Sequence, residues 1–152
     1  MKINVKRIPA DGEALRGTEP AAIMDIDEPD VRFESGIEYE LLAQIQGHSL
    51  LVTGRLATPA TLLCSRCLRR FELRLEVKHF VFMQELHGED FVDLTSQLRE
   101  DILLELPQRA LCRESCRGLC PQCGQDLNEG TCRCARPEWD AHWRALDRLK
   151  LE

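Results

Sequence analysis

The sequence predicts an α+β protein, with a bent antiparallel β-sheet, a packed amphipathic helix and a zinc-stabilised C-terminal segment. Three observations favour this class. Strand-like segments follow one another with short links through the first half of the chain, residues 93–106 carry apolar side chains at helical spacing, and six of the eight cysteines crowd into residues 112–134. Short links favour antiparallel pairing, because parallel strands need long crossover connections.

Four segments are predicted to be strands, because apolar and polar residues alternate along them or because turn signals bound an apolar run. They are residues 2–8, 37–46, 49–63 and 71–83. The last has the clearest alternation, with apolar residues at every second position from Phe71 to Val77. Gly54 and Pro59 interrupt the third, so it is expected to bend or to lie at a sheet edge. Residues 20–29 are expected to form an acidic loop.

Two helices are predicted. The first, over residues 93–106, starts at the candidate N-cap Asp93 and ends before Pro107. Its apolar stripe consists of Leu94, Leu98, Ile102 and Leu106, joined by Leu103. The second, over residues 137–149, carries two tryptophans on an apolar face that is expected to dock onto the body of the protein. The predicted domains are an antiparallel sheet domain with one packed helix over residues 1–107 and a cysteine-rich zinc-binding segment with a C-terminal helix over residues 108–152.

The eight cysteines stand at metal-ligand spacing and are the strongest functional signal. They form four pairs, in chain order Cys64/Cys67, Cys112/Cys116, Cys120/Cys123 and Cys132/Cys134. Two cysteines separated by two residues can form one tight turn with both sulfurs facing the same metal, so each such pair is half of a tetrahedral zinc site. Eight thiols supply two four-cysteine sites, and we expect two Zn²⁺ per chain.

Two other uses of the cysteines remain open, a disulfide framework and a redox-active C-x₂-C motif. The first residues, Met1 to Lys6, contain no apolar stretch typical of an export signal, and no segment approaches the ~20 apolar residues of a membrane span. We therefore expect a cytoplasmic chain without membrane contact, whose reduced thiols capture zinc. A redox-active C-x₂-C motif usually lies in a βαβ pattern, and no such pattern surrounds Cys64.

Loop length indicates how the pairs divide between two sites. The third and fourth pairs are joined by a short loop, so closing a site between them costs little entropy. By elimination, the first pair would join the second across a long loop. In the alternative division the second pair joins the third, and the first pair is metal-free or joins the fourth. A zinc with four protein thiolates has no open position for a substrate, so we expect neither catalytic residues nor a small-molecule substrate, and no enzyme.

The net charge of −6 argues against a protein coated in positive charge that binds nucleic acid non-specifically. Positive charge is nevertheless concentrated after the first cysteine pair, at Arg66, Arg69, Arg70 and Arg74. These guanidinium groups either form a contact surface for RNA phosphates or form a solvated face that offsets thiolate charge. Our hypothesis is that they are RNA-binding residues.

Two stretches carry specific motifs. The first is Leu63-Cys64-Ser65-Arg66-Cys67-Leu68, followed by Phe71. The second runs from Glu105-Leu106-Pro107 through the second cysteine pair and Gly118-Leu119-Cys120-Pro121-Gln122-Cys123-Gly124-Gln125-Asp126-Leu127-Asn128 to Cys132-Arg133-Cys134. In this order, over roughly residues 35–134, they resemble the signatures of the YceD family, the bacterial and plastid large ribosomal RNA subunit accumulation proteins.

The resemblance implies a ribosome biogenesis role in the accumulation or processing of large-subunit (23S) rRNA. The expected partners are pre-ribosomal large-subunit RNA or ribosome-assembly proteins. Two alternatives are a thiol redox switch or oxidoreductase, and a zinc-stabilised adaptor that binds protein only. Rapid alkylation of Cys64 without a chelator would indicate the first, and the lack of a salt-dependent RNA affinity would indicate the second.

Overall fold

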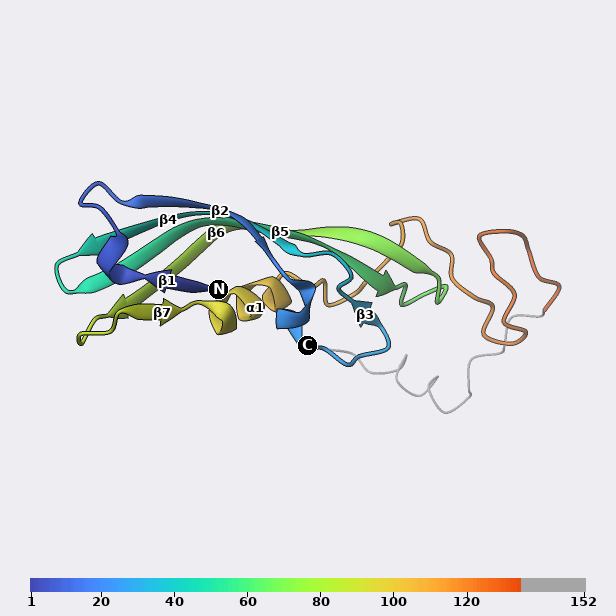
Figure 1. Ribbon diagram of the computed structural model, residues 1–152. Helices are drawn as coiled ribbons and strands as arrows, with labels where there is room; N and C mark the ends of the chain where they lie inside the picture. The colour runs from blue at the N-terminus through green and yellow to red at the C-terminus, as the bar shows by residue number, and fades with distance from the viewer. Residues whose placement is uncertain (135–152) are drawn as a thin grey trace, which may run out of the picture.

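The computed structural model describes residues 1–134, and the helix predicted over residues 137–149 lies outside them. Within this range the chain forms a long curled sheet, a two-stranded sheet and one α-helix, and the cysteine-rich segment extends from one end of the long sheet (Figure 1). The elements are β1 (Lys2–Asn4), η1 (Val5–Arg7), β2 (Glu13–Glu19), η2 (Ala21–Met24), β3 (Val31–Arg32), β4 (Ile37–Gln46), β5 (Ser49–Leu63), β6 (Arg70–Glu85), β7 (Phe91–Asp93) and α1 (Thr95–Leu104). The predicted α+β class, with an antiparallel sheet and a packed helix, is confirmed.

The long sheet is antiparallel, and β5 is its central strand. One edge of β5 pairs with β6, the other edge is shared by β4 and β3, and β2 pairs with β4 on its far side. The connections between β4 and β5 and between β5 and β6 are short turns, as the sequence predicted. Because Cys64 and Cys67 lie in the turn between β5 and β6, this topology places the first cysteine pair at the tip of the longest hairpin.

Of the two alternatives predicted for β5, the irregularity at Gly54 is observed, and β5 lies at the centre of the sheet and not at its edge. The pairing with β6 shifts register between Gly54 and Leu56. A Cβ at Gly54 would collide with the Glu40 carbonyl oxygen, so only glycine allows β4 to approach this closely. Pro59 is tolerated in a central strand because pairing with β4 ends at Ala57 and pairing with β3 begins at Thr61.

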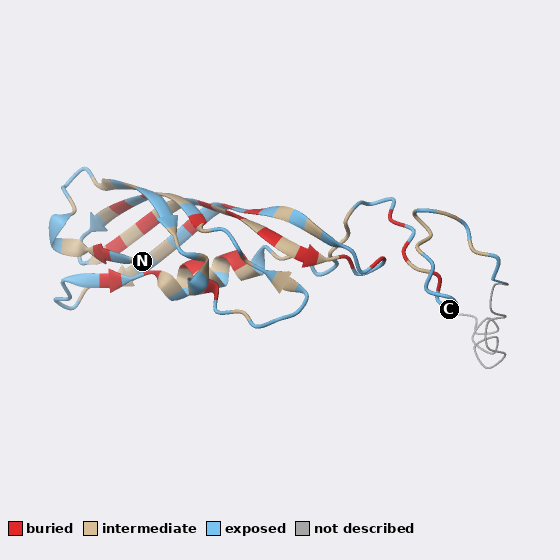
Figure 2. Ribbon diagram, turned by 45° about the vertical axis from the view of Figure 1, so that its right-hand side comes forward, coloured by how far each residue is buried: buried red, intermediate tan, exposed pale blue. Residues whose placement is uncertain are grey.

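The helix α1 packs against β5 and β6 and completes the main core. Leu94, Leu98 and Ile102 are at most 1% exposed, so the predicted stripe faces inward (Figure 2). The Asp93 carboxylate accepts a hydrogen bond of 2.9 Å from the Thr95 backbone N–H and thereby satisfies one donor of the first turn, although Leu94 occupies the N-cap position itself. The core is mostly aliphatic and includes Ile37, Leu50, Leu56, Leu62, Leu75 and Phe80.

Of the short peripheral strands, only β1 falls within a predicted strand. The strand expected over residues 2–8 ends at Asn4 and continues as η1, and β1 pairs with β7 so that Ile3 faces Val92. β2 was missed because most of its side chains are polar or small, as suits an edge strand. Residues 20–29 include η2, which buries Met24. Within residues 1–134, no helix is both long enough and apolar enough to cross a membrane.

Candidate metal centres

The structure gathers the cysteines into two groups of four. The first group consists of Cys64, Cys67, Cys112 and Cys116, and the second of Cys120, Cys123, Cys132 and Cys134. Within each group all four sulfur atoms lie within 4.8 Å of one another. This division is the one that the loop-length argument predicted, and the alternative division is not observed.

The spacing of the sulfurs in the first group fits a tetrahedral metal site. The Sγ atoms of Cys64 and Cys116 are 3.9 Å apart, and those of Cys67 and Cys112 are 3.7 Å apart. Four sulfurs at the ~2.3 Å zinc–sulfur distance occupy tetrahedron corners about 3.8 Å apart. A disulfide requires about 2.0 Å, and all eight cysteines are free. The arrangement therefore suits a bound metal ion and not a disulfide framework.

A tight turn positions the sulfurs of Cys64 and Cys67. The Leu68 N–H donates to the Cys64 carbonyl at 3.0 Å, and the Cys64 N–H donates to the Arg69 carbonyl at 2.9 Å. Leu68 closes the turn with φ +57°, a left-handed conformation that is costly for a side chain with a Cβ. In the second group, Gly124 closes the equivalent turn with φ +73°, and its N–H donates to the Cys120 carbonyl at 2.9 Å. Both C-x₂-C turns thus share one backbone geometry.

Backbone contacts hold the cysteine-rich segment against the first turn. The Ser65 N–H donates to the Ala110 carbonyl at 2.8 Å, and the Leu119 N–H donates to the Arg66 carbonyl at 3.1 Å. Gly118 lies against the same carbonyl, where a Cβ would come within 2.9 Å of the oxygen. These contacts explain how cysteines distant in sequence meet at one point.

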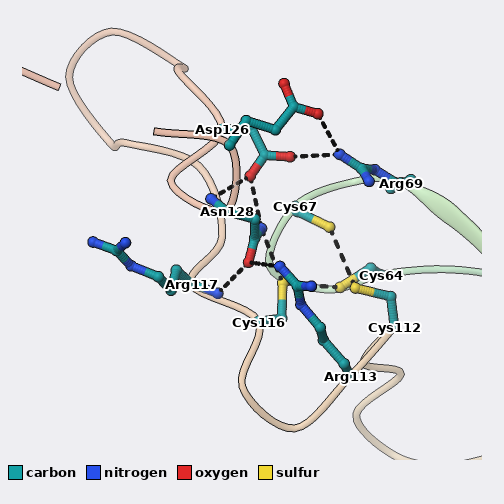
Figure 3. A network of polar contacts seen from close by, with 10 residues as sticks. Cys64, Cys67, Arg69, Cys112, Arg113, Cys116, Arg117, Asp126 and Asn128 are labelled. Atoms are coloured by element: carbon teal, nitrogen blue, oxygen red, sulfur yellow. Dashed lines mark hydrogen bonds and ion pairs between the residues drawn. The ribbon is translucent and has the colours of Figure 1, made fainter. Parts of the chain in front are cut away.

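The side chain of Asn128 connects the two groups (Figure 3). It belongs to the loop between the third and fourth cysteine pairs, yet its Nδ2 donates to the Cys116 Sγ at 3.5 Å. Its Oδ1 accepts the backbone N–H of Arg117 at 2.8 Å and the guanidinium of Arg113 at 3.0 Å. Nδ2 also donates to Asp126 at 2.6 Å. Asn128 stood within the predicted signature, but only its contacts reveal its position beside the sulfur.

The thiols of the first group do not share one pKa. Burial alone would raise the pKa of Cys64, but backbone N–H groups, first of Cys112 and then of Cys67 and Arg66, outweigh it and lower the value to about 6. Burial and the neighbouring Cys67 raise the pKa of Cys112 to about 12. Adjacent thiolates repel each other, and a divalent cation is the usual means of holding four ionised sulfurs together.

The second group likewise contains one thiol with a lowered pKa and one with a raised pKa. The backbone N–H groups of Cys123 and Gln122 lower the pKa of Cys120 to about 6. Contact with the Cys123 thiol raises the pKa of Cys134 to about 12. Cys123 and Cys134 are exposed, whereas Cys64, Cys67 and Cys116 of the first group are buried. The second group is therefore the more accessible of the two.

The four arginines of the RNA-binding hypothesis all have partners within the chain. Arg69 forms ion pairs of 2.9 Å with Asp126 and 2.8 Å with Glu129. The other contacts are Arg74 with Glu38 at 2.6 Å, Arg66 with the Cys116 carbonyl at 2.7 Å and Arg70 with the Pro29 carbonyl at 2.9 Å. Arg69 and Arg74 are thus neutralised by carboxylates, whereas Arg66 and Arg70 donate to carbonyls and keep their positive charge.

Comparisons with known proteins support the family suggested by the cysteine motifs. The family model of the large ribosomal RNA subunit accumulation protein YceD matches residues 81–150. An uncharacterised protein of Mycobacterium tuberculosis is 33% identical over 142 residues, which cover 75% of this chain and 68% of that protein. A protein of Arabidopsis thaliana, large ribosomal RNA subunit accumulation protein YCED homolog 1, chloroplastic, is 34% identical over 59 residues, 39% of this chain and 18% of that protein. No solved structure matches the chain. On its cysteine motifs, the match to the family model and these relatives taken together, the chain belongs to the YceD family.

Proposed function

We propose that the chain is a zinc-binding, non-enzymatic ribosome biogenesis factor that supports accumulation of large-subunit (23S) rRNA. The observation that carries this proposal is the pair of four-sulfur groups at tetrahedral spacing, in a chain of a family named for ribosomal RNA accumulation. The protein would act in the cytoplasm by binding pre-ribosomal RNA or a protein that assembles on it.

The two zinc ions would have a structural role. In each group four thiolates would fill the tetrahedral shell and leave no position for water or substrate. The first zinc would join the tip of the β5–β6 hairpin to the segment after α1, and the second would order the loop that ends at Cys134. The proposed boundary near residue 107 would then separate a sheet domain from a metal-ordered segment. A redox role is less well supported, because Cys64 is fully buried and a reactive thiol must be reached by its partner.

Among residues 1–134, the arginines best placed to contact RNA phosphates are those that keep their charge. Besides Arg66 and Arg70, these include Arg109, Arg117 and Arg133, which lie in the cysteine-rich segment close to the metal centres, are exposed and form no ion pair within the described part of the chain. Guanidinium groups suit phosphate because they can bind it through two parallel hydrogen bonds. Metal-ordered loops would present them at fixed positions.

A charge-reversal experiment tests RNA binding. The triple variant Arg109→Glu, Arg117→Glu, Arg133→Glu should weaken binding to a large-subunit rRNA precursor and lower the salt slope by about one unit for each phosphate that is no longer bound. A matched control is Arg7→Glu, Arg16→Glu, Arg32→Glu, which makes the same charge change at exposed arginines of the sheet domain. An equal reduction of affinity in both variants would show a general charge effect. A wild-type chain without salt-dependent RNA affinity would point to the protein-only adaptor.

A further inference from the structure

The strand β6 has a long free edge. It runs from Arg70 to Glu85, and among residues 1–134 it pairs with β5 alone. The other edge of such a strand presents a row of backbone N–H and C=O groups that can pair with another strand. Natural proteins usually cover or break edges of this length, so the side chains along it indicate what it meets in solution.

Exposed charges alternate in sign along this edge. In chain order the exposed residues of the outer face are Arg70, Glu72, Arg74, Glu76 and Lys78. The intervening residues Phe71, Leu73, Leu75 and Val77 face the core. On β5, the residues opposite Glu72, Arg74 and Glu76 are Thr61, Pro59 and Ala57, none of which is charged. The alternating charges therefore have no complementary row on β5. Within the chain, Arg74 reaches Glu38 of β4 at 2.6 Å and Glu76 of its own strand at 3.4 Å.

An antiparallel copy of the same strand would supply that row. If two copies of β6 pair with Leu75 opposite Leu75, Arg74 of each copy faces Glu76 of the other, and Glu72 faces Lys78. Every such contact occurs twice, because the pair has two-fold symmetry. If the pairing is instead centred on Arg74 or on Glu76, like charges face each other, which is destabilising. The sequence of the edge is thus complementary to itself.

Exposed apolar side chains select one register. Leu68 is 59% exposed, Val81 59% and Met83 71%. Leu68 lies seven residues before Leu75, whereas Val81 and Met83 lie six and eight residues after it. The register shift opposite Arg55 gives β6 one extra residue between Val77 and Phe80, and this extra residue brings Met83 level with Leu68 in the antiparallel pair. Pairing centred on Leu75 therefore brings Leu68 of one copy beside Met83 of the other. Pairing centred on Leu73 also matches charges but would place Leu68 beside Lys78.

We propose that a second copy of this chain docks on the free edge of β6, antiparallel and centred on Leu75, so that the two long sheets become one continuous sheet. Ion pairs between Arg74 of one copy and Glu76 of the other set the register. Contacts of Leu68 with Met83 stabilise both ends of the paired strands. This pairing requires neither RNA nor a protein partner, so it stands independently of the proposed role in rRNA accumulation.

Sedimentation of the zinc-loaded chain over a range of concentrations tests the proposal. The wild type should show a monomer–dimer equilibrium, and Arg74→Glu and Glu76→Arg should each weaken it about tenfold or more, because each reversal sets two pairs of like charges opposite each other. The double variant Arg74→Glu/Glu76→Arg should restore dimerisation. Since Arg74 also pairs with Glu38 and Glu76 within the chain, thermal unfolding of each variant identifies any weakening that is due to folding.

An apolar substitution provides the second test. Met83→Lys should weaken the dimer, whereas Leu104→Lys, at an α1 residue that is 77% exposed and does not belong to β6, should not. Hydrogen exchange of the backbone amides of residues 71–78 should slow as the concentration rises. A chain that stays monomeric at high concentration, or a dimer that Arg74→Glu leaves unchanged, would overturn the proposal.

Discussion

Asn128 Nδ2 lies 3.5 Å from the Cys116 Sγ, which joins the loop of the second cysteine group to a sulfur of the first. Its Oδ1 meanwhile accepts the Arg117 N–H, so the amide cannot turn away without breaking both hydrogen bonds. A hydrogen bond to a metal-binding sulfur holds it in place and stabilises its negative charge. The two groups are therefore physically coupled through one side chain.

Replacement of Asn128 should weaken metal binding by the first group. We expect Asn128→Ala to release zinc to a competing chelator 10–100-fold more readily, the typical effect of removing a group that supports a metal ligand. Gln122→Ala is the matched control, because this amide side chain is exposed and makes no side-chain hydrogen bond within residues 1–134. Equal zinc release from both variants would contradict a role for Asn128.

Serine substitutions should separate the two metal sites. Wild-type chain purified without added metal should contain two zinc ions, and Cys132→Ser should retain the one bound by the first group. Cys64→Ser should lose that zinc instead and leave Cys112 and Cys116 open to alkylation. Metal analysis combined with mass spectrometry of alkylated peptides makes the measurement. If Cys112 and Cys116 remain protected in Cys64→Ser, the first group is not one site.

Zinc should dissociate as the pH falls. Binding holds all four sulfurs of a group as thiolates, which lowers their pKa far below the unfolded value of about 8.5. The stability from zinc is therefore present at higher pH and is lost on acidification. The loss should steepen below about pH 6, because in the metal-free chain the thiols of Cys64 and Cys120, with pKa values of about 6, are then protonated as well and zinc must displace more protons to bind. A zinc-responsive dye measures the release, and a zinc content that stays constant from about pH 8 to about pH 5 would contradict thiolate ligation.

Two glycines with almost equal dihedral angles should differ in their response to alanine. Gly118 and Gly124 have φ of +75° and +73°, so a Cβ costs roughly 1–2 kcal/mol in conformation at either position. At Gly118 the Cβ also meets the Arg66 carbonyl oxygen at 2.9 Å, whereas at Gly124 nothing lies within 4 Å. Gly118→Ala should therefore lower the free energy of unfolding by more than Gly124→Ala. Denaturant titration of both zinc-loaded variants gives the comparison, and equal decreases would show that the Arg66 contact is unimportant.

The long elements were predictable because their patterns repeat. Residues 37–46 and 49–63 match β4 and β5, and the alternation from Phe71 to Val77 continues through most of β6. The apolar stripe of α1 likewise reveals its buried face. β7 has only three residues, too few for a period to show, and the strand predicted over residues 2–8 is shortened to Lys2–Asn4. The pairing of β1 with β7 depends on contact between distant parts of the chain.

By itself, the sequence determined the ligand type and the number of thiols, because ligand spacing is a local property. Loop length favoured one division of the cysteines into two groups, but the tertiary structure decided between that division and its alternative. Only the tertiary structure decided which other side chains lie beside the cysteines and the arginines. The carboxylates beside Arg69 and Arg74, the amide beside Cys116 and the central position of β5 all bring together residues that are distant in sequence. No local pattern encodes such contacts, since they arise only when the core closes and the hairpin tip meets the cysteine-rich segment.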